Sequence, residues 1–156
     1  MANSSMKKIA VLSSGGDGPG MNAAIRSVVR CGLHYGLEIC GVMRGYQGLI
    51  DDDIIEMNHR SVSNIVNRGG TILKTARSKE FGTDEGKERA VQVLRKRGID
   101  GLVVIGGDGS YQGASRLYHK FGFPTVGLPG TIDNDLHGTD QTIGWSTAIN
   151  TALESI

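Results

Sequence analysis

Three glycine-rich loops, each placed behind a short apolar run, constrain the fold of this chain more than any other feature of its sequence. They occupy residues 14–20, 106–110 and 129–135. Short apolar runs that end in a turn are typical of strands buried in a sheet. The chain holds 24 glycines, about twice the average usage. These glycines gather in clusters, unlike those of a flexible linker, and predict turns where the backbone approaches another group closely.

Strands and helices are expected to alternate along the chain. Apolar runs predict strands at residues 8–13, 37–43, 102–105 and 125–128. Helical spacing and capping residues predict helices that begin near residues 20, 61 and 84. Two more helices are predicted by apolar stripes, one with Ala114, Leu117, Tyr118 and Phe121 and a last one that bears Trp145, Ile149, Ala152 and Ile156. This alternation is typical of an α/β fold: a doubly wound, mostly parallel, Rossmann-like sheet with helices on both faces. Because ligands bind at the carboxyl ends of such strands, the three loops are expected to converge on one edge.

The charge and hydropathy of the chain argue against several other classes of protein. Its 17 basic and 16 acidic residues give a net charge of +1, so nothing indicates nucleic acid or an anionic membrane as a partner. The longest apolar runs, residues 9–12 and 102–105, are too short for a membrane span or a signal peptide. Cys31 and Cys40 form no CxxC pair and are expected to be free thiols. We therefore expect a soluble, cytoplasmic protein.

The first loop, residues 14–20, has the composition of a phosphate-binding turn. Its glycines remove side chains that would block a phosphate, and the helix that comes next offers free N–H groups at its positive end. The spacing matches neither the GxGxxG pattern nor the Walker pattern with its GK[ST] ending, so the standard dinucleotide and P-loop interpretations fail. The alternative is a tight turn between strand and helix that binds no ligand.

The second loop, residues 106–110, places a carboxylate among glycines at a strand end. With phosphates on the neighbouring amides, Asp108 is suited to hold the Mg²⁺ that accompanies a nucleotide, because this ion takes one or two carboxylates plus phosphate oxygens and water. The alternative is that Asp108 only caps the next helix.

The third loop, residues 129–135, carries two carboxylates. Asp133 and Asp135 are two residues apart in an extended segment, so their side chains need not point the same way. One is suited to accept the proton of a substrate hydroxyl, as phosphoryl transfer requires, while the other serves a metal or the structure. The alternative is a loop of helix caps and Asx-turns.

The three loops read GGDxPGMN, GGDGSY and PGTIDND, and in this combination the chain resembles bacterial-type 6-phosphofructokinase. Further matches lie at residues 44–49 and 67–71, and the resemblance runs from about Lys7 to the last residue. It implies a glycolytic kinase that transfers the γ-phosphoryl group of MgATP to the 1-hydroxyl of fructose 6-phosphate, giving fructose 1,6-bisphosphate and ADP. A relation to NAD or lipid kinases, which share GGDG, is disfavoured by the third loop.

The resemblance also implies a role for each matching residue. The nucleotide-binding residues are Gly16, Arg77, Ser78, Gly107, Asp108, Gly109 and Ser110, with Asp108 as the Mg²⁺ ligand. The substrate-binding residues are Thr131, Ile132, Asp133 and Asp135, with Asp133 as the catalytic proton acceptor. The guanidinium of Arg77 would bridge β- and γ-phosphate oxygens as charge develops on them.

Two glycines indicate which phosphoryl donor is used. Relatives that use pyrophosphate typically carry Asp in place of the glycine that comes after the Asp of GGDG, and Lys in place of the glycine of PGTIDND. This chain has Gly109 and Gly130 at these positions. Since an Asp at position 109 would repel the α-phosphate of ATP, the resemblance implies ATP as the donor.

Effector control is implied by a second set of matches. Arg26 and Arg30 match arginines that bind an ADP-like activator or phosphoenolpyruvate between the subunits of a homo-oligomer, a tetramer in this family. At a further effector position this chain has His59, with Arg60 next to it, and a neutral imidazole holds a phosphate less well than a guanidinium. From the residues alone, two arginines one turn apart also fit a solvated helix face.

The family's chain continues into a second domain that supplies basic residues for the sugar phosphate. The resemblance therefore implies that residues 7–156 are the ATP-binding domain, which ends before that substrate domain, and that residues 1–6 are an N-terminal extension. The 156-residue chain alone is then expected to be inactive. The alternative is a catalytically inactive nucleotide-binding or effector-sensing module of the same fold.

Overall fold

The computed structural model describes residues 6–16 and 18–156. Residues 1–5 of the expected N-terminal extension, and Asp17 of the first loop, lie outside the described residues. In chain order the elements are β1 (Lys8–Ser13), α1 (Met21–His34), β2 (Glu38–Val42), α2 (Gly45–Ile50), β3 (Ile54–Met57), the 3₁₀ helix η1 (Glu80–Gly82), α3 (Asp84–Lys96), β4 (Gly101–Gly106), α4 (Asp108–Phe121), β5 (Thr125–Pro129) and α5 (Trp145–Glu154).

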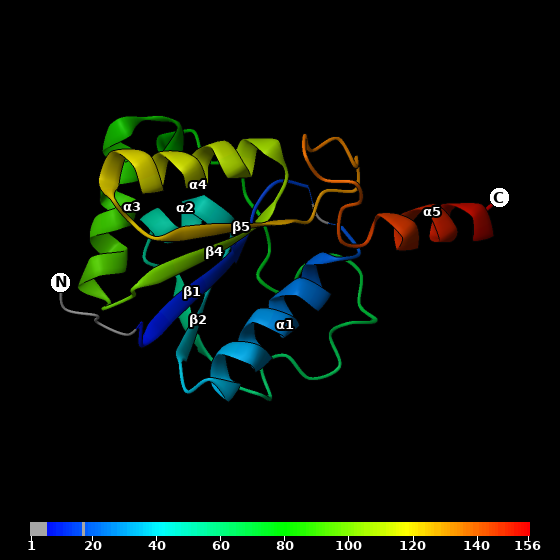
Figure 1. The fold of residues 1–156 in the computed structure, drawn as a ribbon, viewed down its shortest axis with the longest axis horizontal. Coiled ribbons are helices and arrows are strands. Elements are labelled where there is room, and N and C mark those ends of the chain that lie inside the picture. Colours follow the sequence, from blue (N-terminus) through cyan, green and yellow to red (C-terminus); the bar gives the residue numbers. More distant parts are fainter. Residues whose placement is uncertain (1–5, 17) are drawn as a thin grey trace.

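The strands form one five-stranded sheet in the order β3-β2-β1-β4-β5. Figure 1 shows β2, β1, β4 and β5 side by side in this order. β1 pairs in parallel with β2 and β4, and β4 pairs in parallel with β5, whereas β3 runs antiparallel at one edge. The chain therefore begins at the centre of the sheet, moves to one edge, and crosses back to build the other half from β4. This order confirms the predicted doubly wound, mostly parallel sheet.

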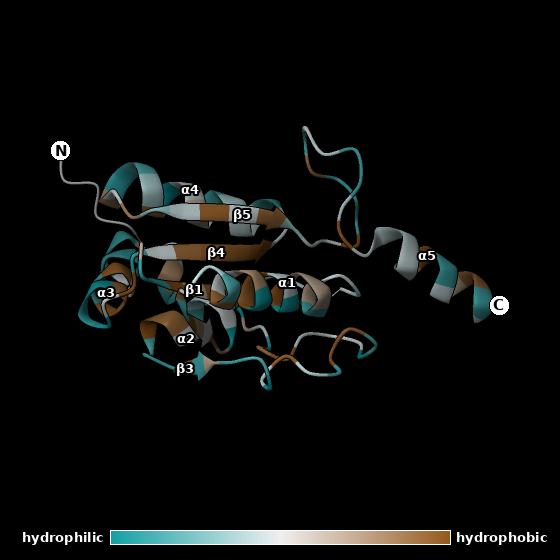
Figure 2. Ribbon diagram, turned by 60° about the horizontal axis from the view of Figure 1, so that its bottom comes forward, coloured by the Kyte–Doolittle hydropathy of each residue, from teal (hydrophilic) through white to brown (hydrophobic). Residues whose placement is uncertain are grey.

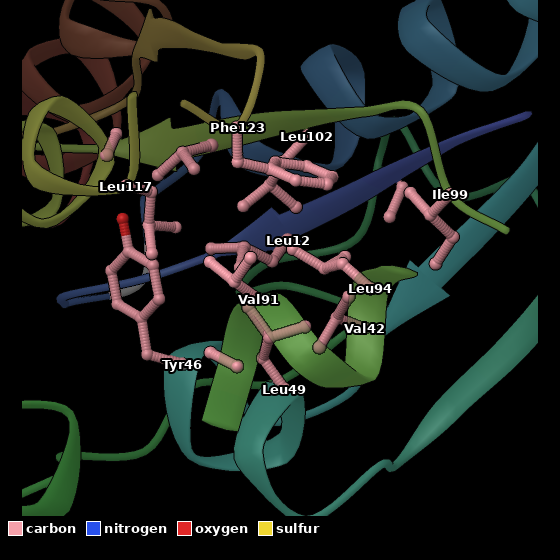
Figure 3. Close-up of a cluster of buried hydrophobic side chains, with 14 of the residues drawn as sticks. Leu12, Val42, Tyr46, Leu49, Val91, Leu94, Ile99, Leu102, Leu117 and Phe123 are labelled. Carbon is pink, nitrogen blue, oxygen red and sulfur yellow. The ribbon is translucent and has the colours of Figure 1, made fainter. Parts of the chain in front are cut away.

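Helices cover both faces of the sheet, as predicted. One face packs against α2, α3 and α4, and its core includes Leu12, Leu94 and Leu117 (Figure 3). The other face packs against α1, and its core includes Val11 and Ile25. Val11 and Leu12 are consecutive and both fully buried, so β1 is covered on both sides. This double burial explains why the strand is a continuous apolar run instead of an alternating one.

Local sequence signals determine where α3 begins and ends. Thr83 is the N-cap, and its Oγ1 accepts a hydrogen bond from the amide of Gly86 at 3.0 Å. Acidic residues such as Asp84 occupy the first turn and basic residues such as Arg95 the last, as the helix dipole favours. Gly98 lies just past the end with a φ of 65°, a conformation that ends helices.

The short helix predicted at Ser61 is not formed. Residues 59–64 are turns, and Asn64 has a φ of 54°, a left-handed conformation that cannot continue a right-handed helix. The side chain of Asn58 accepts hydrogen bonds from the amides of Arg60 and Ser61 at 2.8 and 3.2 Å, which stabilises a turn instead. The apolar side chains of this segment still join the core beneath α1.

Three elements, α2, β3 and the three-residue η1, are not predicted by the sequence patterns. α2 has six residues, and Gly45 and Gly48 lower its helix propensity. β3 has four residues, and two of them are exposed, so its apolar pattern is too short to identify. α2 nevertheless reaches the second glycine-rich loop, because the hydroxyl of its Tyr46 donates to the carbonyl of Ser110.

The last helix, α5, projects from the body of the domain (Figure 2). Of the described residues, none in α5 is buried, and Leu153 is 66% exposed. The helix ends at Glu154, two residues before the predicted end. Within the part of the chain that the structure describes, no helix combines the length and the apolar character needed to cross a membrane.

Candidate active site

The carboxyl ends of β1, β4 and β5 lie side by side at one edge of the sheet, as the sequence predicts. In the sheet register Gly106 pairs with Pro129. Two backbone hydrogen bonds continue this alignment into the loops. The amide of Ser14 donates to the carbonyl of Ile105 at 2.9 Å, and the amide of Gly130 donates to the carbonyl of Gly106 at 3.0 Å. The three glycine-rich loops therefore meet at one place.

A cleft of about 1090 Å³ opens where the loops meet. Pockets for small-molecule ligands have volumes on the order of 300–1,000 Å³, so this cleft is large enough for a nucleotide. The cleft is lined by all the residues that the resemblance assigns to nucleotide, metal or substrate: Gly16, Arg77, Ser78, Gly107, Asp108, Gly109, Ser110, Thr131, Ile132, Asp133 and Asp135. The structure thus brings together segments that are far apart in the sequence.

The second loop leads directly into α4, a helix of 14 residues. Its N-cap is Gly107, and among the described residues no side chain caps its first turn. Asp108 and Gly109, the first two residues of the helix, are exposed and line the cleft. The first amides of a long helix therefore face the cleft without a protein partner, which is a favourable arrangement for an anion. The alternative that Asp108 is the helix cap is wrong, because Asp108 lies inside the helix.

The carboxylate of Asp108 is held at one oxygen. Its Oδ2 accepts a hydrogen bond from Nε2 of Gln112, one turn further along α4, at 2.7 Å. Across residues 6–16 and 18–156, no group of three or more His, Cys, Asp or Glu side chains is arranged to hold a metal ion by itself. The donor set fits Mg²⁺ that is shared between a carboxylate, phosphate oxygens and water, which is the usual environment of this ion beside a nucleotide.

The third loop is held in shape by its own side chains and by Thr142, which comes after it. Thr142 is only 3% exposed, and its Oγ1 donates to the carbonyl of Thr131 at 2.5 Å. The amide of Thr142 donates to Oδ1 of Asn134 at 2.8 Å, and Asn134 has a left-handed φ of 52°. The amide of Asp133 donates to Oγ1 of Thr131 at 3.2 Å. These bonds join Thr131 and Asn134 to Thr142 and fix the backbone on either side of Asp133.

Both aspartates of the third loop are available to a ligand. Asp133 and Asp135 are exposed and line the cleft. Neither carboxylate has a hydrogen-bond or ion-pair partner among the described residues. The alternative of an internal Asx-turn network therefore fits Asn134, and it does not fit the two aspartates.

Arg77 brings a positive charge into the cleft. It lies in a segment without regular structure between Leu73 and η1, and its side chain is exposed. In the described part of the chain no carboxylate lies within ion-pair distance of its guanidinium. An unpaired guanidinium that lines a cleft beside the amino end of α4 is well placed to bind a phosphate group.

Sequence reasoning missed four residues that line the cleft: Tyr46, Phe81, Lys87 and Arg116. Tyr46 of α2 and Phe81 of η1 form the aromatic wall of the cleft: they stack with ring centroids 3.8 Å apart, and the hydroxyl of Tyr46 lies 2.7 Å from the carbonyl oxygen of Ser110. The apolar periodicity of a helix indicates only whether such a residue faces the core or the solvent. A pairing across 35 positions, such as Tyr46 with Phe81, leaves no mark on local periodicity.

Burial changes the ionisation of two of these groups. Desolvation raises the pKa of the Tyr46 phenol. Desolvation, and then the positive charge of Arg116, lowers the pKa of the Lys87 ammonium group. Lys87 is 2% exposed, and its Nζ donates to the carbonyls of Gly82 and Thr83 at 2.9 Å each. Lys87 therefore ties η1 to the start of α3 and fixes the aromatic wall of the cleft.

The predicted effector residues lie outside the cleft. Nη1 of Arg26, on α1, donates to the carbonyl of Val62 at 2.5 Å, which places α1 against the segment that carries His59 and Arg60. Arg30, His59 and Arg60 are exposed, and none of the four predicted residues lines the cleft. The structure therefore brings Arg26 close to this turn and separates the set from the catalytic candidates.

The comparisons with known proteins agree on one family. The family model described as "Phosphofructokinase" matches residues 8–156. Curated proteins named "ATP-dependent 6-phosphofructokinase" are 61% identical in Paenibacillus macquariensis and 63% identical in Clostridium botulinum, each over 151 residues. These matches cover 97% of this chain and 47% of each relative, so the chain spans about half the length of the curated relatives that it matches.

Solved structures give the same result. The Pichia pastoris phosphofructokinase in the T-state superposes with a TM-score of 0.91 at 40% identity, over 97% of this chain and 18% of that one. The phosphofructokinase of Saccharomyces cerevisiae gives a TM-score of 0.86 at 42% identity, over 96% of this chain and 23% of that one. The chain belongs to the phosphofructokinase family.

Proposed function

We propose that this chain is the nucleotide-binding domain, residues 7–156, of an ATP-dependent 6-phosphofructokinase. The observation that carries the proposal is the open amino end of α4, which faces the cleft beside Arg77 and the two unpaired aspartates. The reaction is transfer of the γ-phosphoryl group of MgATP to the 1-hydroxyl of fructose 6-phosphate. The names of the curated relatives support both the donor and the acceptor class.

The phosphate groups of the nucleotide bind where backbone amides and positive charge coincide. The amides at the start of α4 and at Gly16 supply donors without side chains in the way. At Gly16 an added methyl group would meet nothing within 4 Å, so the backbone there is open to the cleft. The guanidinium of Arg77 balances charge on the β- and γ-phosphate oxygens, and this balance is worth most as phosphoryl transfer proceeds.

Asp108 and the third loop complete the chemistry. Asp108 would hold the Mg²⁺ that arrives with the nucleotide, and the bound ion would neutralise phosphate charge. Asp133 accepts the proton of the attacking hydroxyl, because it is an unpaired carboxylate on a loop whose backbone is fixed on both sides. Thr131, Ile132 and Asp135 lie beside it and would contact the sugar phosphate.

The aromatic wall suits the base of the nucleotide. Phe81 and Tyr46 form a stacked pair, and Gly113 of α4 brings the backbone close to both rings. An added methyl group at Gly113 would lie 2.9 Å from the Phe81 ring. Both rings line the cleft, and only 6% of Tyr46 and 7% of Phe81 is exposed, so the pair would support a purine from behind, together with the backbone of Gly113, and not as an open ring face.

The proposal extends to the assembled enzyme. A second domain would supply the basic residues that hold the sugar phosphate, and the enzyme would act as a cytoplasmic homo-oligomer. Arg26, Arg30, His59 and Arg60 would bind a phosphorylated effector, either an ADP-like nucleotide or phosphoenolpyruvate. The position of these four residues outside the cleft supports a site distinct from catalysis.

We expect the 156-residue chain to bind MgATP weakly and to form no fructose 1,6-bisphosphate by itself. Binding needs only the local amides and Arg77, whereas transfer also needs the sugar held in line, an alignment worth about 7–11 kcal/mol of barrier. Isothermal titration calorimetry and a coupled assay on the purified chain test both statements.

Arg77→Gln is expected to weaken MgATP binding by about tenfold to a hundredfold, because it removes the guanidinium that binds the phosphate groups.

The matched control is Arg68→Gln, at an exposed arginine that does not line the cleft. Equal MgATP affinity in the two variants would contradict the role given to Arg77. Turnover by the chain alone would show that no second domain is needed.

We expect Gly109→Asp to weaken MgATP binding far more than Mg-pyrophosphate binding. A Cβ added at position 109 meets nothing within 4 Å, so the change adds charge without a clash at the first side-chain atom. The new carboxylate would lie near the α-phosphate, a group that pyrophosphate lacks, and like charges repel in a partly dry site. Calorimetry with both ligands measures the difference, and Gly109→Asn separates charge from size. Equal weakening of both ligands would mean that position 109 does not contact the α-phosphate.

A further inference from the structure

A chain of hydrogen bonds runs from α2 to the turn beside Arg77. On α2, Nε2 of Gln47 donates to Oδ1 of Asp51 at 3.0 Å. Oε1 of Gln47 accepts from Oγ of Ser78 at 2.7 Å, and Oγ of Ser78 accepts from the amide of Phe81 at 3.0 Å. One glutamine side chain thus connects the end of α2 to the start of η1.

The direction of these bonds determines what the Ser78 hydroxyl is able to do. A serine hydroxyl has one proton, and here it is donated to Gln47. The amide of Gln47 cannot be reversed without cost, because its NH₂ group must face the Asp51 carboxylate and its oxygen must face Ser78. Ser78 lines the cleft, yet its hydroxyl has no proton left for a phosphate oxygen.

The Asp51 end of this series of hydrogen bonds is fixed by a charged partner. Asp51 accepts a second bond from Nη2 of Arg44 at 3.1 Å, and Nε of Arg44 donates to Asp53 at 3.0 Å. α2 itself is anchored by buried side chains, including Leu49. Gln47 therefore extends from a fixed support toward a segment that has no regular structure.

The turn held by Ser78 carries two residues of the cleft. Arg77 precedes Ser78 directly, and Phe81 lies three positions after it and stacks on Tyr46. Residues 74–78 form neither helix nor strand, so side-chain contacts must define their position. A bond from Gln47 to Ser78 fixes the point from which the Arg77 side chain enters the cleft.

We propose that Gln47 is a positioning residue for nucleotide binding, which acts through Ser78 to hold the turn that presents Arg77 and Phe81. This inference rests on the proposed nucleotide site. It also changes the expected role of Ser78: the hydroxyl shapes the turn, and contact with the nucleotide is left to its neighbours.

The test uses the 156-residue chain with Gln47→Leu, Ser78→Ala and the double variant, and Gln92→Leu as the matched control. Gln92 is an exposed glutamine on α3 that does not line the cleft. Leucine keeps most of the volume of glutamine and removes both hydrogen bonds. We expect each single variant to weaken MgATP binding by about three- to tenfold. The double variant is expected to bind MgATP no more weakly than the more affected single variant, because both changes break the same series of hydrogen bonds.

Hydrogen exchange provides a readout that does not depend on the nucleotide. The amide of Phe81 is expected to lose protection in all three variants, while the amides in the middle of α3 keep theirs. Absence of MgATP binding in the unsubstituted chain would contradict the proposed function of this chain, and Phe81 exchange would still decide whether Gln47 holds the turn.

Three results would overturn the inference. One is unchanged affinity together with unchanged Phe81 protection in Gln47→Leu. Another is a double variant whose loss of MgATP binding free energy equals the sum of the two single losses, since residues that act through the same hydrogen bonds do not give additive losses. The third is weaker binding in Ser78→Ala with normal or tighter binding in Gln47→Leu, which would mean that the Ser78 hydroxyl contacts the phosphate directly.

Discussion

In a chimaera that joins this chain to the remainder of a curated relative, Asp133→Ser is expected to lower turnover by about two to four orders of magnitude. The chimaera carries this chain in place of the 151 matched residues of the Clostridium botulinum protein, which is 63% identical over that span. MgATP affinity is expected to change much less, because a general base acts only while the hydroxyl loses its proton. A steady-state coupled assay gives turnover, and calorimetry gives the affinity.

The shape of the third loop makes this test sharp. The backbone around Asp133 is fixed by Thr131, Asn134 and Thr142, and none of these bonds involves the Asp133 carboxylate. The substitution therefore removes the proposed base and leaves the bonds that hold the loop. A loss of turnover with normal MgATP binding points to chemistry and not to a displaced loop.

Asp140→Ser is the matched control for this substitution. Asp140 is an aspartate of the same loop region, outside the cleft, and only its carbonyl has a hydrogen bond, from Asn134, among the described residues. We expect near-normal turnover from this variant. Near-normal turnover from Asp133→Ser as well would remove Asp133 from the role of base.

The predicted parts of the fold are those in which one physical cause acts on neighbouring residues. β1 was predictable because consecutive residues such as Val11 and Leu12 are buried on opposite faces of the sheet. The meeting of the three loops was predictable because parallel strands end at a common edge. α3 was predictable because its cap at Thr83 and the glycine after its end are local signals.

The missed parts depend on contacts between distant residues or on single backbone angles. The helix predicted at Ser61 fails because Asn64 adopts a left-handed conformation that its sequence permits and does not require. The aromatic wall of the cleft depends on Tyr46 meeting Phe81, and the Ser78 hydroxyl depends on Gln47, which is 31 positions away. A residue's type shows that it is able to form such a bond, and only the fold determines its partner.

A different distant contact, between the first loop and the segment that comes after the third, is made backbone to backbone. An added methyl group at Gly20 would lie 2.0 Å from the carbonyl oxygen of Ile143, and one at Gly144 would lie 2.2 Å from the amide nitrogen of Gly20. The φ and ψ of Gly20 are −82° and −14°, which any residue adopts. Glycine is therefore needed at position 20 for space and not for its conformational freedom.

Gly20→Ala is expected to lower the free energy of unfolding of the chain by about 3 kcal/mol or more, at or above the upper end for overpacking. The clash is with a backbone carbonyl, which cannot rotate away as the end of a side chain does. Relief requires that the segment around Ile143 move away from α1, and the third loop with Asp133 and Asp135 moves with it. Urea unfolding measures the loss of stability, and calorimetry is expected to show weakened MgATP binding under conditions where the variant is still folded.

Gly69→Ala is the matched control, because position 69 is exposed and an added methyl group there meets nothing within 4 Å. Its stability should stay within about 0.5 kcal/mol of the unsubstituted chain. If Gly20→Ala were equally mild, the two segments would have to be able to separate without cost, and their contact would not position Asp133. A large loss at Gly20 beside a small one at Gly69 would instead tie the placement of Asp133 to the start of α1, through a contact that involves no side-chain chemistry.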